Sequence, residues 1–145
     1  MKNTKQSISK GFKITHAAGV EIRFDYYLDD APATANAFQK ILPFKRFFMH
    51  ARVSGEEIWT DEAPPLQVIQ ENASVFVMPG EIVYGPESPA RVKTSNCIGI
   101  YYGSGKGLDA ANIFACVKEQ DRHLLVELGN KIWLHGKEEL TFREI

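Results

Sequence analysis

The feature that most limits what this chain can fold into is a succession of eight or nine short apolar segments separated by Gly, Pro, Ser and Asp residues. Segments of this kind, rich in Val, Ile, Phe and Tyr, are typical of β-strands. They do not alternate regularly with helical segments, which argues against a parallel sheet built from βαβ units. We therefore expect a mainly β fold, a closed barrel or a sandwich, decorated by two helices.

The apolar segments also predict where each strand lies. The expected strands are residues 12–15, 20–28, 46–53, 56–60, 74–78, 81–84, 97–103, 112–119 and 138–145. Residues 61–67 are expected to form a loop, because Pro64 and Pro65 lack backbone donors. The glycine-rich GSGKG at 103–107 is expected to be a flexible loop, which leaves open a lid over a binding site.

Two segments have helical rather than strand periodicity. Residues 31–42 place apolar side chains on one face of a helix. Asp29 or Asp30 is the expected N-cap of this helix, and Pro32 fits its first turn. Residues 121–136 form the second expected helix, since their leucine and isoleucine residues recur four positions apart.

The composition suits a compact domain and argues against several classes of function. The chain has 145 residues, of which 44% are hydrophobic, and a formal net charge of -1. We expect a flexible segment at 1–11, followed by one domain at 12–145. A charge this close to zero, without a basic block, argues against a nucleic-acid partner. No apolar run is long enough for a signal peptide or a bilayer span, so a cytoplasmic protein without a membrane partner is expected.

The most unusual segment is the hairpin FFMHARVSGEEIW at residues 47–59, which has a histidine, an arginine and two glutamates around its turn. If residues 54–55 form a two-residue turn, Arg52 lies opposite Glu57. Because side chains alternate between the faces of a strand, the polar and aromatic ones would then share one face. The members of this face are Phe48, His50, Arg52, Glu57 and Trp59.

This polar face has the groups of a binding or catalytic site. Arg52, held by Glu57, would present guanidinium donors to a carboxylate or carbonyl group. His50 could act as an acid or a base near neutral pH. The alternative is a solvent-exposed cross-strand ion pair, worth roughly 0–1 kcal/mol. Two large aromatic residues on the same face favour a groove over a solvated surface.

Other kinds of site have weaker support. The 4 histidines lack the HxH and HExxH spacings of a metal site, so neither a metal nor another cofactor is expected. GSGKG lacks the residue order of a phosphate-binding loop. Cys97 and Cys116 are expected to be buried thiols rather than a disulfide. Tyr84 follows a Pro-Gly turn and is expected to point into the same cavity as Arg52, or else to lie at the barrel rim.

Several stretches resemble known proteins. In residues 29–38, an acid is followed by Pro-x-Thr-Ala-x-x-Phe, which is similar to the cyclophilin helix signature. Residues 48–52, FMHAR, are similar to the Phe-His-Arg of the cyclophilin strand that follows this helix, at stretched spacing. Residues 44–59, 79–84 and 128–142 more closely resemble a family of small bacterial proteins of unknown function with a cyclophilin-like barrel.

The resemblance, over about residues 12–144, implies a closed eight-stranded antiparallel barrel with two helices. It also places Arg52 near a cyclophilin-type groove. True prolyl isomerases continue after this arginine through a Phe-Met-x-Gln-Gly-Gly-type segment, where this chain has VSGEEIW. The acidic pair in that segment suits a small polar ligand better than a proline ring.

Three functions follow as hypotheses. The first is a barrel that binds a small polar or anionic ligand near Arg52. Its candidate catalytic residues are Arg52, His50 and Glu57, and its candidate ligand-binding residues are Phe48, Trp59 and Tyr84. The second is a peptidyl-prolyl isomerase or a module that binds proline peptides. The third is a structural domain of a homo-oligomer, an assembly that exposed strand edges favour in any case.

Overall fold

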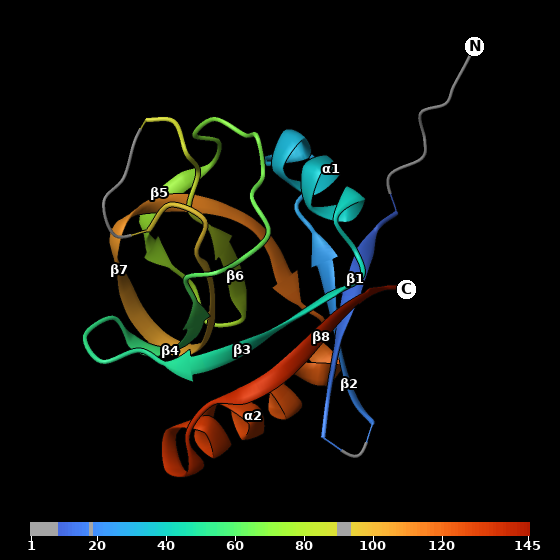
Figure 1. The fold of residues 1–145 in the computed structure, drawn as a ribbon, viewed down its shortest axis with the longest axis vertical. Helices are drawn as coiled ribbons and strands as arrows, with labels where there is room; N and C mark the ends of the chain where they lie inside the picture. The colour runs from blue at the N-terminus through green and yellow to red at the C-terminus, as the bar shows by residue number, and fades with distance from the viewer. Residues whose placement is uncertain (1–8, 18, 90–93) are drawn as a thin grey trace.

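The computed structural model describes residues 9–17, 19–89 and 94–145. Within them the fold is mainly β, with eight antiparallel strands and two α-helices (Figure 1). The strands are β1 Gly11–His16, β2 Val20–Tyr26, β3 Phe44–His50, β4 Gly55–Thr60, β5 Ala73–Val77, β6 Glu81–Tyr84, β7 Ile98–Val117 and β8 Glu138–Glu144. The helices are α1 Pro32–Lys40 and α2 Arg122–His135, with the 3-10 turn η2 Glu119–Asp121 directly before α2.

The strands form one sheet whose ends are joined. Their order is β2-β1-β8-β3-β4-β7-β5; β6 pairs with β7, and β2 also pairs with β7. The pairing of β2 with β7 links six strands into a ring, whereas β5 and β6 are attached to β7 alone among the described strands. The predicted strand number, antiparallel pairing and two helices are confirmed. The ring is uneven, however, so the strands do not form the regular eight-stranded barrel that was expected.

Strand β7 corrects one prediction about the chain. Ile98–Val117 is one continuous strand of 20 residues that curves around one end of the molecule (Figure 1). Residues 103–107 therefore belong to a strand, and the predicted loop is wrong. Gly105 lies opposite Gly55 of β4 and Val77 of β5. A Cβ at Gly105 would come within 2.3 Å of a backbone oxygen, so the glycines allow close packing of backbones within the sheet.

Aromatic side chains from both ends of the sequence fill the main core. Phe12 of β1 stacks on Phe24 of β2 with 5.0 Å between ring centroids, and it lies equally close to Phe38 of α1. Phe48 of β3 and Phe142 of β8 extend this cluster, and all of these side chains are fully buried. Burying each ring contributes about 1.5–3 kcal/mol, so the cluster joins α1 to the sheet.

Helix α1 begins without the predicted cap. Its N-cap residue makes no side-chain cap hydrogen bond, so neither Asp29 nor Asp30 has the predicted role. Instead, the carboxylate of Glu71 accepts hydrogen bonds from the backbone N–H of Ala33 at 3.1 Å and of Thr34 at 2.8 Å. Glu71 precedes β5 in the sequence, so the helix receives its cap from a distant part of the chain.

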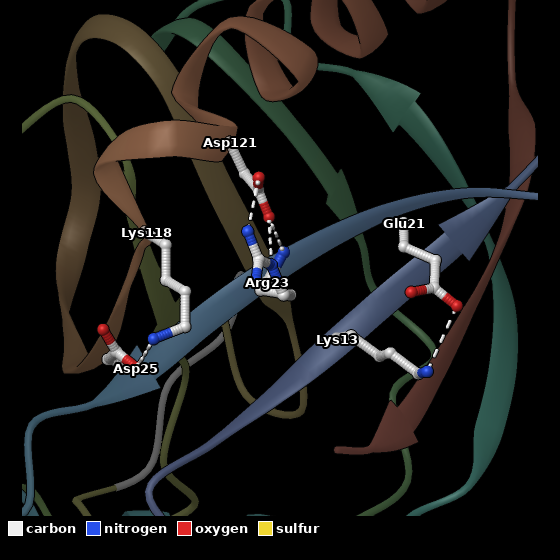
Figure 2. A network of polar contacts seen from close by, with 6 residues as sticks. All are labelled: Lys13, Glu21, Arg23, Asp25, Lys118 and Asp121. Atoms are coloured by element: carbon white, nitrogen blue, oxygen red, sulfur yellow. Dashed lines mark hydrogen bonds and ion pairs between the residues drawn. The ribbon is translucent and has the colours of Figure 1, made fainter.

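A polar network fixes the β1–β2 hairpin to the start of α2 (Figure 2). The Asp121 carboxylate accepts hydrogen bonds from the backbone N–H, Nε and Nη2 of Arg23 at 2.9, 2.8 and 3.1 Å. Hydrogen bonding to Arg23 holds the pKa of the Asp121 carboxyl below its usual value. Asp121 is also the N-cap residue of α2, but its carboxylate binds Arg23 rather than the helix. Two further ion pairs flank it along β2, namely Lys118–Asp25 and Lys13–Glu21.

The remaining predictions about the chain have mixed outcomes. Most of the predicted flexible segment 1–11 lies outside the described residues, and Gly11 already belongs to β1. Cys97 is buried and Cys116 is half-buried, and the two are not joined in a disulfide, as predicted. In the part of the chain that is described, no helix is both long and apolar enough to cross a membrane.

Candidate functional site

The β3–β4 hairpin, which carries the predicted site, has a different register from the one expected. Met49 lies opposite Trp59, and His50 lies opposite Ile58. The prediction paired His50 with Trp59 through a two-residue turn at 54–55, and both the turn and the pairing are wrong by one position. Since a shift of one residue exchanges the faces of one strand relative to the other, the predicted polar face does not exist as a unit.

The cause of this shift is strand β7. Gly55 pairs with Gly105 of β7, and the Ser54 carbonyl accepts a hydrogen bond from the Lys106 N–H at 3.0 Å. Ser54 and Gly55 therefore belong to the ladder between β4 and β7 and do not form the tip of a hairpin. The connection from β3 runs through the residues before them, and it is longer than a two-residue turn.

In the observed register, the predicted site residues of β3 and β4 lie on two different sides of the sheet. Glu57 and Trp59 lie on the same side of the sheet as Met49, whereas Phe48 and His50 lie on the other. Phe48 is fully buried in the main aromatic core, so its predicted place beside a ligand is wrong.

His50 is held by hydrogen bonds at both ring nitrogens. Its Nδ1 lies 2.7 Å from the Ala51 carbonyl oxygen, and its Nε2 lies 2.7 Å from the Tyr102 hydroxyl. Because a carbonyl can only accept, Nδ1 carries a proton and donates it to the Ala51 carbonyl. The imidazole also meets the Trp133 ring of α2 edge-on, with 4.7 Å between centroids. His50 thus connects β3 to β7 and α2.

A cavity of about 400 Å³ opens between the β3–β4 connection, β4 and both halves of β7. Its exposed lining is mainly apolar, and its size is that of a site for a small organic molecule. Four of the predicted residues line it, namely His50, Arg52, Glu57 and Trp59. The structure therefore gathers these four around one cavity, although they do not share one face of the hairpin.

Tyr84 lies away from this cavity, so its predicted position beside Arg52 is wrong. The Tyr84 hydroxyl accepts a hydrogen bond from the Leu66 N–H at 3.0 Å and donates to the Pro64 carbonyl at 2.9 Å. These contacts fix the loop between β4 and β5 to β6. Burial raises the pKa of Tyr84 to about 12, so its hydroxyl stays protonated as a structural donor.

Glu57 is the most unusual group in the cavity. It is only 9% exposed, and the Ser54 hydroxyl donates a hydrogen bond to its carboxylate. Burial raises the pKa of Glu57 to about 7, although hydrogen bonds from Ser54 and Tyr101 act in the opposite direction. A Cβ at Gly99 would lie 1.9 Å from Glu57 Oε2, so this glycine leaves the space that the carboxyl fills. A carboxyl that titrates near neutral pH can both accept and donate a proton.

Arg52 lies exposed at the rim of the cavity. Within the described ranges, Arg52 makes neither a hydrogen bond nor an ion pair, so its predicted pairing with Glu57 is wrong. The five N–H donors of its guanidinium are therefore available to a carboxylate or a carbonyl group of a ligand.

Several lining residues were missed in the sequence. Both Tyr101, from the expected strand at 97–103, and Asp109, which follows the expected loop at 103–107, come from β7. Cys97 also lines the cavity, and burial raises its pKa to about 11, which keeps the thiol protonated and unreactive. The Thr94 hydroxyl is buried and has no hydrogen-bond partner among the residues described. The same residues contain no group of three His, Cys, Asp or Glu side chains that could hold a metal ion.

A family model and several solved structures are similar to this chain. Residues 14–143 match the model of a family described as "Protein of unknown function (DUF3830)". No curated protein sequence matches the chain significantly. Among solved structures, McbB in complex with tryptophan is 18% identical with a TM-score of 0.74, over 92% of this chain and 44% of the McbB chain. The chain thus spans less than half the length of McbB.

Two further structures are similar over nearly their whole lengths. The hypothetical protein AF2241 from Archaeoglobus fulgidus is 16% identical with a TM-score of 0.65, over 99% of this chain and 100% of AF2241. A cyclophilin-type peptidyl-prolyl isomerase from Cryptosporidium parvum, crystallised with the dipeptide Ala-Pro, is 13% identical with a TM-score of 0.58, over 92% of this chain and 96% of the isomerase. These similarities confirm a cyclophilin-like fold, and at such low identities they concern the fold alone.

Proposed function

We propose that this chain, which belongs to the DUF3830 family of proteins of unknown function, binds a small organic molecule in the cavity beside β4 and β7. The ligand has an apolar or aromatic body and an anionic group that Arg52 holds. The observation that carries the proposal concerns the Arg52 guanidinium, which lies at the rim of a mainly apolar cavity of about 400 Å³. It has no hydrogen-bond or ion-pair partner among the described residues.

The walls of the cavity favour an apolar body. Trp59 offers an indole, while Met49, Val83 and Leu108 offer aliphatic surface. Met49 and Leu108 are 39% and 56% exposed, so a ligand would cover apolar area that water now contacts. An aromatic ring beside Trp59 would also gain from ring contacts, which are worth about 0.5–1.5 kcal/mol beyond area burial.

The anionic group is assigned to Arg52 because the guanidinium matches a carboxylate in geometry. Two parallel N–H···O bonds can form between them, and such charge-assisted bonds are stronger than neutral ones. McbB, which has a similar fold, was solved with tryptophan, a molecule that has an aromatic body and a carboxylate. This supports the choice of indole carboxylates as probes. Prolyl isomerisation, the alternative function, rests on similarity of fold alone.

The test is a calorimetric titration with indole-3-propionate, which has the ring and the carboxylate but no amine. Replacing Arg52→Met should weaken binding by at least about tenfold, the loss of a charge-assisted hydrogen bond. Arg143→Met is the matched control, because Arg143 is also exposed but lies on β8 and does not line the cavity. Equal affinities for the wild type and Arg52→Met would reject the proposal. A dissociation constant weaker than about 10 mM for the wild type would also reject it.

A further inference from the structure

The polar groups inside the cavity point to a narrower class of ligand than its shape does. We propose that the ligand also carries a protonated amine, and that the Glu57 carboxylate is the partner of this amine. The inference rests on the proposed function and adds to the ligand a second charged group, besides the anionic group that Arg52 holds. A molecule with this charge pattern is an aromatic amino acid or a close derivative.

The first argument is that Glu57 has no cationic partner among the residues that the structure describes. A buried carboxylate is normally paired with a cation, because burying an unpaired charge costs several kcal/mol. Glu57 receives hydrogen bonds from the hydroxyls of Ser54 and Tyr101, but none of the ion pairs in the described ranges includes it. An ammonium group of a ligand would supply both the missing charge and further donors.

The second argument is the charge of the groups that line the cavity together with Glu57. From the β3 side come Arg52 and His50, and from the β7 side come Cys97, Tyr101 and Asp109. Burial keeps the Cys97 thiol and the Tyr101 phenol protonated. Arg52 is the one arginine or lysine among the described lining residues, and it lies at the rim, while Asp109 adds a further acid. A cationic group fits this interior, whereas a second anion does not.

Binding of an amine to Glu57 must release a proton near neutral pH. With the pKa of Glu57 at about 7, about a tenth of the molecules have an ionised Glu57 at pH 6 and about nine-tenths at pH 8. Because apparent affinity scales with the fraction of the competent state, an amine should bind about tenfold more tightly at pH 8 than at pH 6. At pH 7 about half a proton should be released for each ligand bound.

The test compares tryptamine with tryptophol, which has a hydroxyl in place of the ammonium. Calorimetry at both pH values, in buffers of different ionisation enthalpy, gives affinity and proton release together. Tryptamine should bind more tightly than tryptophol at pH 8, with about a tenfold loss at pH 6. Tryptophol should bind equally at both pH values. Equal affinity of the two probes at pH 8, or no measurable binding of tryptamine, would overturn the inference.

Variants assign the effect to one carboxyl. Glu57→Gln should abolish both the preference for tryptamine and the proton release. Glu56→Gln should preserve both, because Glu56 is exposed, does not line the cavity and accepts a hydrogen bond from the Ser104 N–H instead. A preference that survives in Glu57→Gln would contradict the assignment. If this variant did not fold, the two probes on the wild type would still decide whether the cavity prefers an amine.

The two proposals can fail separately. Indole-3-propionate has no amine, so its dependence on Arg52 tests the proposed function alone. If that dependence is found and tryptamine shows no preference, the amine site is wrong and the binding function stands. If tryptamine depends on Glu57 but the acid is insensitive to Arg52→Met, the assignment of the anionic group is the one that fails.

Discussion

Replacing Glu57 by glutamine should make the protein more stable, and the gain should depend on pH. The carboxyl has a pKa of about 7 in the fold, against an ordinary value of 4.5. At about 1.4 kcal/mol for each pKa unit, ionised Glu57 costs the fold roughly 3 kcal/mol. Glutamine has nearly the same shape and can accept the hydrogen bond from Ser54, but it is never charged.

The sign of the effect follows from which state holds the proton. Below pH 4.5 Glu57 is protonated in both the folded and unfolded states, so its ionisation costs nothing. Between about 4.5 and 7 the unfolded chain loses the proton while the folded protein keeps it, so stability falls as the pH rises. Above about pH 7 the cost is complete and constant. The advantage of Glu57→Gln should therefore be near zero at pH 4.5 and reach roughly 2–3 kcal/mol at pH 8.

The assay is urea unfolding of the wild type, Glu57→Gln and Glu56→Gln at several pH values between 4.5 and 8. Differences between proteins at each pH remove the contribution of all other titrating groups. Glu56 is exposed and does not line the cavity, so Glu56→Gln, which removes the same charge one residue away, is the matched control. A difference between Glu57→Gln and the wild type that is constant over this range would refute the reasoning. A variant that becomes less stable than the wild type as the pH rises would refute it as well.

Three further substitutions test other parts of the structure. Asp121→Ala removes the acceptor of three Arg23 hydrogen bonds and should lower the free energy of unfolding by about 1–3 kcal/mol near neutral pH. Because the pKa of Asp121 is lowered in the fold, this loss, measured by urea unfolding, should shrink as the pH falls below 3.8. A loss that stays constant over that range would count against the pairing of Asp121 with Arg23. Glu71→Ala should cost about 0.5–2 kcal/mol in thermal unfolding, since α1 loses its cap, while an unchanged melting temperature would show that water replaces it. Gly99→Ala places a methyl group against the Glu57 carboxyl and should remove the preference for tryptamine. Gly107→Ala, whose new Cβ would have its nearest neighbouring atom at 3.2 Å, should retain this preference. Equal behaviour of the two variants would reject the position of the Glu57 carboxyl beside Gly99.

The positions of most strands and both helices could be predicted because their signals are local. Apolar alternation and turn residues mark the β1–β2 pair, and helical spacing marks α1 and α2. The middle of β7 could not be found in this way, because glycines that allow close backbone contacts look like loop residues in a sequence. The cap of α1 by Glu71 could not be predicted either, because a carboxylate from a distant part of the chain leaves no pattern in the sequence around the helix.

The candidate site was predicted only in part, and its main error is the register of the β3–β4 hairpin. The register was predicted from the two hairpin strands alone. In the structure Gly55 also pairs with β7, and this shifts the register by one residue. Arg52 and Glu57 still line one cavity because both lie close to the end of the hairpin. Tyr101 and Asp109 were missed because they belong to β7, whose course depends on pairing between residues that are distant in the sequence.

The central claim is that the cavity beside β4 and β7 is a binding site in which Arg52 holds an anionic group. The most direct test is an NMR titration of the isotope-labelled protein with indole-3-propionate, followed at assigned backbone amides. The account predicts saturable shifts that are largest at Arg52, Glu57 and Gly99, and that weaken strongly in Arg52→Met. Shifts that map to another surface, or that are the same in the variant, would contradict it.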